Sequence, residues 1–215
     1  MNKIFVLFFL LVTFTQAQEV NPFTKEVEDI QKKYDTLWDS SKETIVFTGS
    51  SSVRIWHDLQ ERFPKHQIVN SGFGGSQASD LLTFSEELIL RFKPKKVFIY
   101  EGDNDISAGK NSKEIIGDIN AIISKIREQN SATKVVLIAA KPSIARWNLK
   151  RDYKRLNRKF KRMSRKDADL SYVNVWKPML DGNKVKEEIF IEDGLHMNTK
   201  GYEIWYETIK EYVDD

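Results

Sequence analysis

Short apolar runs alternate with longer amphipathic segments along most of this chain. Five apolar runs predict strands: "TIVFTG" (44–49), "QIVNSG" (67–72), "KKVFIYEG" (95–102), "KVVLIAAKP" (134–142) and "SYVNVW" (171–176). Apolar residues at helical spacing predict helices between and after them, over residues 53–63, 77–92, 112–130, a basic stretch ending near Ala168, and 199–213. Because the strands are apolar on both faces, the pattern predicts a parallel sheet covered by helices on both sides, which is an α/β fold.

The first 17 residues depart from this alternation. Lys3 precedes an almost wholly apolar run from Ile4 to Phe14, and a small residue, Ala17, follows in "TQAQ". This predicts a secretory signal peptide over residues 1–17, cut near Ala17, and therefore an exported protein, periplasmic or secreted. The apolar run is too short to span a bilayer, which disfavours a membrane anchor.

Residues 18–43 are predicted to form an N-terminal helical extension. Apolar residues recur at helical spacing between Asn21 and Ser40. One domain, residues 44–215, then holds the alternating strands and helices.

Composition narrows the classes of function. The chain has 215 residues, 40% hydrophobic and 30% charged, which suits one domain with a sizeable core. It contains no cysteine, so disulfides, thiolate metal sites and a cysteine nucleophile are excluded. The formal net charge of +3 falls to +2 without Lys3 and indicates little about partners.

Charge is concentrated in residues 146–166, which contain eleven Lys or Arg and one acid, Asp152. This basic segment is either a solvated helix face or a surface that makes weak contact with anionic lipid, lipopolysaccharide or polysaccharide. No nucleic-acid reading motif accompanies the charge, so a nucleic-acid partner is not predicted.

Polar and glycine residues follow the predicted strands. In parallel sheets ligands bind beyond the carboxyl ends of the strands. The segments expected there are 49–52, 70–76, 101–107, 141–147 and, before the last helix, 192–198. A serine, glycines, an asparagine and an Asp-x-x-His therefore share one rim of the sheet, and these are the groups that acyl transfer by serine requires.

The chemistry explains why each group is needed. A serine hydroxyl is a poor nucleophile unless a base, most often histidine, removes its proton. Asp193, three residues before His196, can hold the other imidazole nitrogen. The oxyanion of the tetrahedral intermediate needs preorganised donors, and Gly75 N–H and the Asn104 amide are suitable ones.

These blocks resemble the motifs of the SGNH, or GDSL-type, hydrolases. The first block is Gly49-Ser50-Ser51, the second carries Gly75, the third is Gly102-Asp103-Asn104-Asp105, and the last is Asp193-Gly194-Leu195-His196. The resemblance covers most of the mature chain and follows the family order. It implies a flavodoxin-like three-layer α/β/α sandwich with a five-stranded parallel sheet.

The resemblance also implies a function. A metal-independent triad of Ser51, His196 and Asp193 would hydrolyse carboxylic esters, with Ser51 N–H, Gly75 N–H and the Asn104 side chain binding the oxyanion. Export and the absence of a long apolar lid segment favour short acyl, such as acetyl, esters on carbohydrate. Lysophospholipase, lipase or thioesterase activity is the alternative, and an inactive carbohydrate- or surface-binding module is the alternative of another class.

One position departs from the family pattern, because Ser50 replaces the aspartate of the first block. This leaves the nucleophile open between Ser50, Ser51 and Ser52, with Ser51 favoured and a neighbouring serine expected to brace the turn or cap the following helix.

Two further residues are candidate substrate contacts, Arg146 and Trp147 in the loop after the fourth strand. No cofactor or metal is predicted. A zinc motif is absent, and a calcium-loop count starting at Asp103 has Ala108 where glycine is needed.

Overall fold

The computed structural model describes residues 21–214, so the predicted signal peptide lies outside the described residues. The helices are α1 (Thr24–Leu37), α2 (Ser51–Arg54), α3 (Leu59–Arg62), α4 (Ala78–Thr83), α5 (Ser85–Leu88), α6 (Asp103–Ser107), α7 (Ser112–Gln129), α8 (Lys150–Ser164) and α9 (Thr199–Asp214). Short 3₁₀ turns are η1 (Leu90–Phe92), η2 (Trp147–Leu149) and η3 (Glu187–Ile189). The strands are β1 (Thr44–Gly49), β2 (Gln67–Gly72), β3 (Lys96–Tyr100), β4 (Lys134–Ile138), β5 (Leu170–Val173), β6 (Leu180–Asp181) and β7 (Lys184–Val185).

Five strands form one parallel sheet in the order β2-β1-β3-β4-β5. The predicted five-stranded parallel sheet is therefore confirmed. The chain runs from β1 outward to β2 and then returns past β1 to β3. This reversal creates a switch point between the ends of β1 and β3, where α/β sheets bind ligands.

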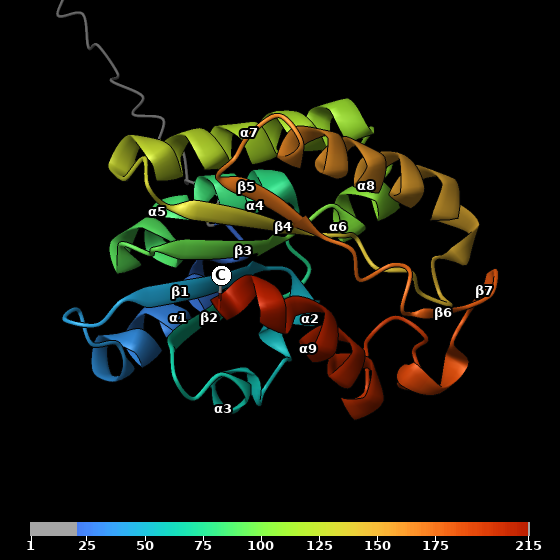
Figure 1. Ribbon diagram of the computed structural model, residues 1–215, viewed down its shortest axis with the longest axis horizontal. Helices are drawn as coiled ribbons and strands as arrows, with labels where there is room; N and C mark the ends of the chain where they lie inside the picture. The colour runs from blue at the N-terminus through green and yellow to red at the C-terminus, as the bar shows by residue number, and fades with distance from the viewer. Residues whose placement is uncertain (1–20, 215) are drawn as a thin grey trace, which may run out of the picture.

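Helices cover both faces of the sheet (Figure 1). Side chains from α1, α4, α5, α7 and α8 pack on one face, and those from α2, α3 and α9 pack on the other. Along β1, Val46 belongs to the first core while Ile45 and Phe47 belong to the second. Successive side chains of a strand point to opposite faces, so a strand buried on both sides is apolar throughout.

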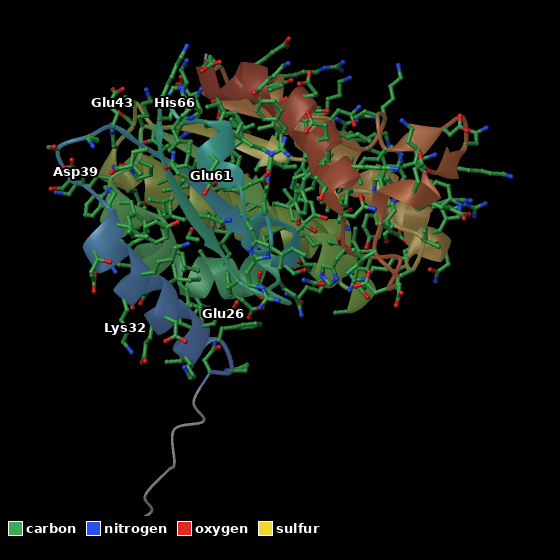
Figure 2. The ribbon with its side chains drawn as sticks, turned by 90° about the horizontal axis from the view of Figure 1, so that it is seen from below. Glu26, Lys32, Asp39, Glu43, Glu61 and His66 are labelled. Carbon is green, nitrogen blue, oxygen red and sulfur yellow. The ribbon has the colours of Figure 1, made fainter. Side chains whose placement is uncertain are left out.

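α1 belongs to the same packed body as the rest of the chain. Its Val27 and Tyr34 are buried in the first core, and the Tyr34 hydroxyl accepts a hydrogen bond from Asn70 N–H on β2 at 2.7 Å. Lys32 is exposed on the outer side of this helix (Figure 2).

Two predicted helices are interrupted. The segment 53–63 forms α2 and α3, because the Asn70 amide donates to the carbonyls of Val53 and Trp56 at the break, at 2.8 and 3.4 Å. The segment 77–92 forms α4, α5 and η1, and the Ser85 hydroxyl donates to Leu82 O at 2.9 Å where α4 ends. The small β6–β7 hairpin and α6 are additions that the sequence pattern did not indicate.

Among residues 21–214, no helix combines the length and the apolar character needed to cross a bilayer.

Candidate active site

The nucleophile position is built by the sharp turn after β1. Gly49 has φ +124°, and a Cβ there would lie 2.0 Å from Tyr100 O, so the turn requires glycine. Ser50 N–H donates to that same carbonyl at 3.1 Å. These contacts bring the start of α2, where Ser51 lies, to the carboxyl edge of the sheet beside β3.

Ser51, His196 and Asp193 form a continuous chain of contacts. His196 Nε2 lies 2.9 Å from Ser51 Oγ, and His196 Nδ1 lies 2.5 Å from Asp193 Oδ2. The structure therefore brings together three residues whose outermost members, Ser51 and His196, are 145 positions apart in the sequence.

Asp193 is itself held in place. Its Oδ1 accepts hydrogen bonds from Leu195 N–H and His196 N–H, each at 2.8 Å. Burial raises the pKa of this carboxyl, but the hydrogen bonds from His196 and Leu195 outweigh burial and lower the pKa to about 2. Asp193 is thus ionised across the neutral range and is a fixed acceptor for the imidazole Nδ1–H.

The two neighbouring serines lie away from this chain of contacts. Ser50 and Ser52 are each only 2% exposed. The expectation that a serine hydroxyl caps α2 is wrong, because Ser50 at the N-cap makes no side-chain capping bond. The Ser50 backbone carbonyl instead accepts from Val53 N–H and Arg54 N–H, at 2.9 and 3.2 Å.

Three groups are the predicted donors to the oxyanion: Ser51 N–H, Gly75 N–H and the Asn104 amide. Gly75 has φ +81° in the glycine turn after β2, and Asn104 lies in α6 after β3. Within residues 21–214, the N–H groups of Ser51 and Gly75 have no hydrogen-bond acceptor. Unpaired N–H groups beside a serine are what an oxyanion hole requires.

The orientation of the Asn104 amide is fixed from both ends. Its Nδ2 donates to Ser76 O at 2.8 Å, and its Oδ1 accepts from Arg146 Nη1 at 3.1 Å. Each amide nitrogen carries two hydrogens, so one N–H remains for the oxyanion. Arg146, singled out as a substrate contact, thus bonds to the predicted oxyanion donor, and its contact with substrate stays a prediction.

A buried ionic cluster lies behind Asn104. Asp103 contacts Arg146 Nη1 at 2.5 Å, Lys141 Nζ at 3.6 Å and the hydroxyls of Tyr100 and Tyr153. Burial raises the pKa of Asp103, but the two cations outweigh burial and lower it. Lys141 Nζ also donates to Leu195 O at 2.7 Å. The cluster therefore links the Asn104 segment to the histidine loop.

Two buried charged residues near the site, Glu101 and Lys141, carry no motif in the sequence. Glu101 is 1% exposed, and its Oε1 accepts from the Ser76 hydroxyl at 2.7 Å, next to the glycine turn. Burial raises the pKa of Glu101 well above its usual range. Glu101 directly follows β3 and Lys141 lies three residues after the end of β4, and this placement after buried strands was the only available signal.

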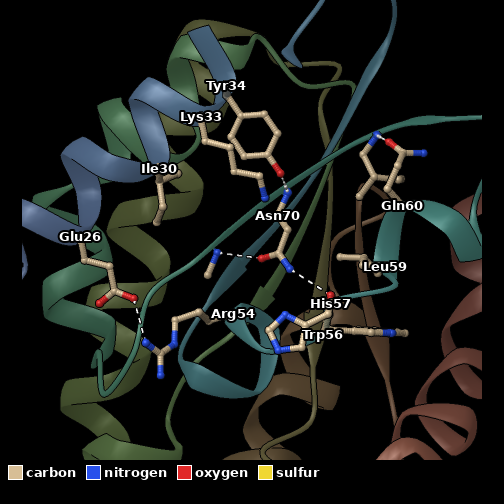
Figure 3. A pocket seen from close by; sticks show the side chains of 12 residues that line it. Glu26, Ile30, Lys33, Tyr34, Arg54, Trp56, His57, Leu59, Gln60 and Asn70 are labelled. Carbon is tan, nitrogen blue, oxygen red and sulfur yellow. Dashed lines mark hydrogen bonds and ion pairs between the residues drawn. The ribbon is translucent and has the colours of Figure 1, made fainter. Parts of the chain in front are cut away.

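α1 also reaches the glycine turn. Glu26 accepts from Gly74 N–H through both carboxylate oxygens, at 3.1 and 3.2 Å, and pairs with Arg54 at 3.4 Å. A cavity of about 200 Å³ separates α1 from α2 beside this pair (Figure 3). The predicted extension thus contributes a contact to the loop that carries Gly75.

Trp147, the second candidate substrate contact, packs against protein. Its ring stacks on Trp176 with centroids 6.0 Å apart and an interplanar angle of 19°, and Lys150 Nζ lies 4.7 Å from its centroid. A role in substrate binding stays a prediction for this residue.

Comparison with known proteins decides the family. The model of the GDSL-like Lipase/Acylhydrolase family matches residues 38–204. The chain belongs to this family. It is a carboxylic ester hydrolase with the SGNH fold, and the resemblance seen in its motifs is confirmed.

Individual relatives are distant. Bovine platelet-activating factor acetylhydrolase IB subunit alpha1 (Bos taurus) is 26% identical over 74% of this chain and 69% of its own length. A solved structure from Streptococcus pneumoniae, named as a platelet activating factor, is 26% identical to this chain. The two structures superpose with a TM-score of 0.77 over 88% of this chain and 93% of the other. An acetylxylan esterase from Geobacillus stearothermophilus, at 15% identity, shares the fold with a TM-score of 0.65 over 79% and 93% of the two chains.

Proposed function

We propose that this family member is an exported serine esterase that removes short acyl groups, such as acetyl, from carbohydrate. The observation that carries the proposal is the chain of contacts from Asp193 through His196 to Ser51, at 2.5 and 2.9 Å. In this arrangement Ser51 supplies the nucleophile and His196 the base, so no further residue is needed for either role.

The geometry supports the following sequence of steps. Ser51 Oγ attacks the ester carbonyl while His196 Nε2 takes the hydroxyl proton, and Asp193 stabilises the imidazolium. Ser51 N–H, Gly75 N–H and Asn104 Nδ2–H bind the oxyanion. His196 then protonates the leaving alcohol. Water, deprotonated by His196, attacks the acyl-enzyme and releases the carboxylic acid and free Ser51.

Relatives support short acyl substrates. The bovine relative is named as an acetylhydrolase and the Geobacillus protein as an acetylxylan esterase. Both names describe removal of an acetyl group, one of them from a polysaccharide. The identity to either protein is low, so the acetyl group and the carbohydrate are part of the proposal.

Export rests on the sequence of residues 1–17. Expression with the native N-terminus, followed by mass measurement of the mature protein, tests it. A mature chain that begins near Gln18 in the exported fraction supports the proposal, and an uncleaved chain retained in the cell contradicts it.

A panel of p-nitrophenyl esters of rising acyl length tests the activity. The expected order of kcat/KM is acetyl and propionyl highest, with a fall beyond butyryl. Release of acetate from acetylated xylo-oligosaccharides tests the carbohydrate part. Undetectable hydrolysis of every ester by a folded protein would refute the proposal.

Lysophospholipase activity is a second candidate because of one apolar hollow. Ile55, Ile191 and Met197 line a hollow of about 510 Å³. It adjoins the triad, since Ile55 N–H donates to Ser51 O at 3.0 Å and Met197 follows His196. A rise of kcat/KM toward octanoyl and longer esters would favour this function over the first.

A further inference from the structure

A hollow of about 270 Å³ lies between α8 and the segment that follows β5, outside the catalytic residues. β5 is an edge strand of the sheet, and α8 packs against it (Figure 1). The volume is just below the roughly 300 Å³ at which drug-sized ligand pockets begin. It therefore suits about one sugar unit of a longer chain.

One wall of the hollow is strongly cationic. Lys154, Arg158 and Lys161 line it from α8, and their spacing places them on one flank of the helix. Within residues 21–214 none of the three forms an ion pair, whereas Arg155 on the same helix pairs with Asp152 at 3.1 Å. Three neighbouring cations without a carboxylate favour an anionic occupant.

The opposite wall is aromatic and amide-bearing. Trp176, Tyr172 and Asn174 line it. Trp176 is 8% exposed and held in place by its stack on Trp147. Tyr172 is only partly buried, and an aromatic ring beside amides and cations matches an acidic sugar, which presents C–H groups, hydroxyls and a carboxylate.

The wall is also rigid. Asn157 on α8 exchanges two hydrogen bonds with the backbone of Ala140, each at 2.9 Å. This pair fixes the helix to the end of β4, so the cations are presented on an anchored element rather than on a loop.

A lipid surface fits less well. The large apolar side chains that are exposed within residues 21–214 are Leu37, Ile144 and Ile191, and none lies on α8. Helices that bind a membrane insert apolar side chains of that kind between the headgroups. The hollow is also concave, whereas a bilayer surface is flat.

The hollow is connected to the active site through side chains. Trp176 stacks on Trp147, and the residue before Trp147, Arg146, donates to Asn104, which is the proposed oxyanion donor. These contacts link the hollow, through Trp147 and its neighbour Arg146, to the proposed oxyanion donor.

We propose that this hollow is a subsite for a carboxylated sugar residue of the polysaccharide whose ester Ser51 cleaves. The inference rests on the proposed carbohydrate esterase function. The subsite holds an acidic unit at a distance from the ester, so it selects acidic over neutral polysaccharides.

Binding of trigalacturonate, measured by calorimetry and by tryptophan fluorescence on the protein from residue 18 onward, tests the subsite. The ligand carries no ester, so binding is measured without turnover. We expect saturable binding that weakens as salt is raised, and binding of neutral xylotriose that is at least tenfold weaker.

Matched variants locate the site. The triple variant Lys154→Gln, Arg158→Gln, Lys161→Gln should lose about 10- to 30-fold in affinity, as expected for three partly exposed charge contacts. The control Arg155→Gln, Lys159→Gln, Lys166→Gln removes the same charge from the same segment without touching the hollow. It should lose less than about threefold. Single Arg158→Gln, with an expected loss of two- to fivefold, replaces the triple variant if that protein does not fold.

Several outcomes would overturn the inference. Equal losses in the two triple variants would mean that net charge alone attracts the ligand. Binding to phosphatidylglycerol vesicles but not to trigalacturonate would assign the basic surface to lipid. Trigalacturonate that binds no better than xylotriose would also overturn it, whereas failure to hydrolyse every p-nitrophenyl ester would refute the proposed function and not the subsite.

Discussion

The contact between Arg146 and Asn104 predicts a measurable coupling in catalysis. Arg146 Nη1 donates to Asn104 Oδ1 at 3.1 Å and so fixes which way the amide nitrogen points. Replacing Arg146 with methionine removes this hydrogen bond but keeps much of the side-chain volume. Asp103 retains Lys141 at 3.6 Å and two tyrosine hydroxyls, so its carboxylate stays partnered.

The magnitude follows from the type of bond. A hydrogen bond to a charged group contributes about 1.5–3 kcal/mol, and each ~1.4 kcal/mol changes a rate tenfold. The Arg146 side chain is 19% exposed, so we take the lower part of the range and expect a fall in kcat of about 10- to 30-fold. Asn104→Ala should cost about 10²- to 10³-fold in kcat with KM nearly unchanged, because an oxyanion donor acts on the transition state.

The double variant separates positioning from substrate contact. If Arg146 acts through Asn104, then Arg146→Met in the Asn104→Ala background should lower kcat by less than about threefold further. The assay is steady-state hydrolysis of p-nitrophenyl acetate, with melting curves for every variant and Arg155→Met as an exposed-cation control. Multiplicative effects of the two substitutions, or a rise in KM for Arg146→Met alone, would refute the reasoning and favour direct contact of Arg146 with substrate.

Four further outcomes are expected. Ser51→Ala should lose at least about 10³-fold in kcat, whereas Ser50→Ala should change only the melting temperature. The reverse result would identify Ser50 as the nucleophile. EDTA should leave the activity unchanged, because the proposed steps use only Ser51, His196 and Asp193; loss on chelation that a divalent ion restores would contradict the metal-free steps. Burial raises the pKa of Glu101, so the parent loses stability as the pH rises and this carboxyl must ionise inside the fold. The melting temperature of Glu101→Gln should therefore rise relative to that of the parent between pH 4 and pH 8. A difference that stays constant with pH would argue against the raised pKa. Glu26→Ala should lower kcat about tenfold with little change in KM, because Gly74 N–H loses a charged acceptor; an unchanged kcat would show that α1 does not position the glycine turn.

The sequence determined the strand order along the chain and the identity of the reactive groups. Runs such as 44–49 are apolar on both faces, and that pattern is stable only between two layers of helices. Ser51, Asn104 and His196 were identified from the segments that follow strands or precede the last helix. That reading works because a parallel sheet gathers the carboxyl ends of its strands at one edge.

The tertiary structure decided how those groups are supported. A neighbour of Ser51 was expected to brace the turn or cap the following helix, and the turn is held by the backbone contact of Ser50 N–H to Tyr100 O, at the end of a buried strand. Arg146 was a candidate substrate contact from the sequence, and the fold adds its hydrogen bond to Asn104, which no sequence pattern indicated.

Glu26 lies 48 positions before Gly74, in a segment that the alternating pattern set apart from the domain. These contacts join residues far apart in sequence through single side-chain bonds. Local periodicity carries no information about such pairs, since it records which face of an element is buried and not which residue faces it.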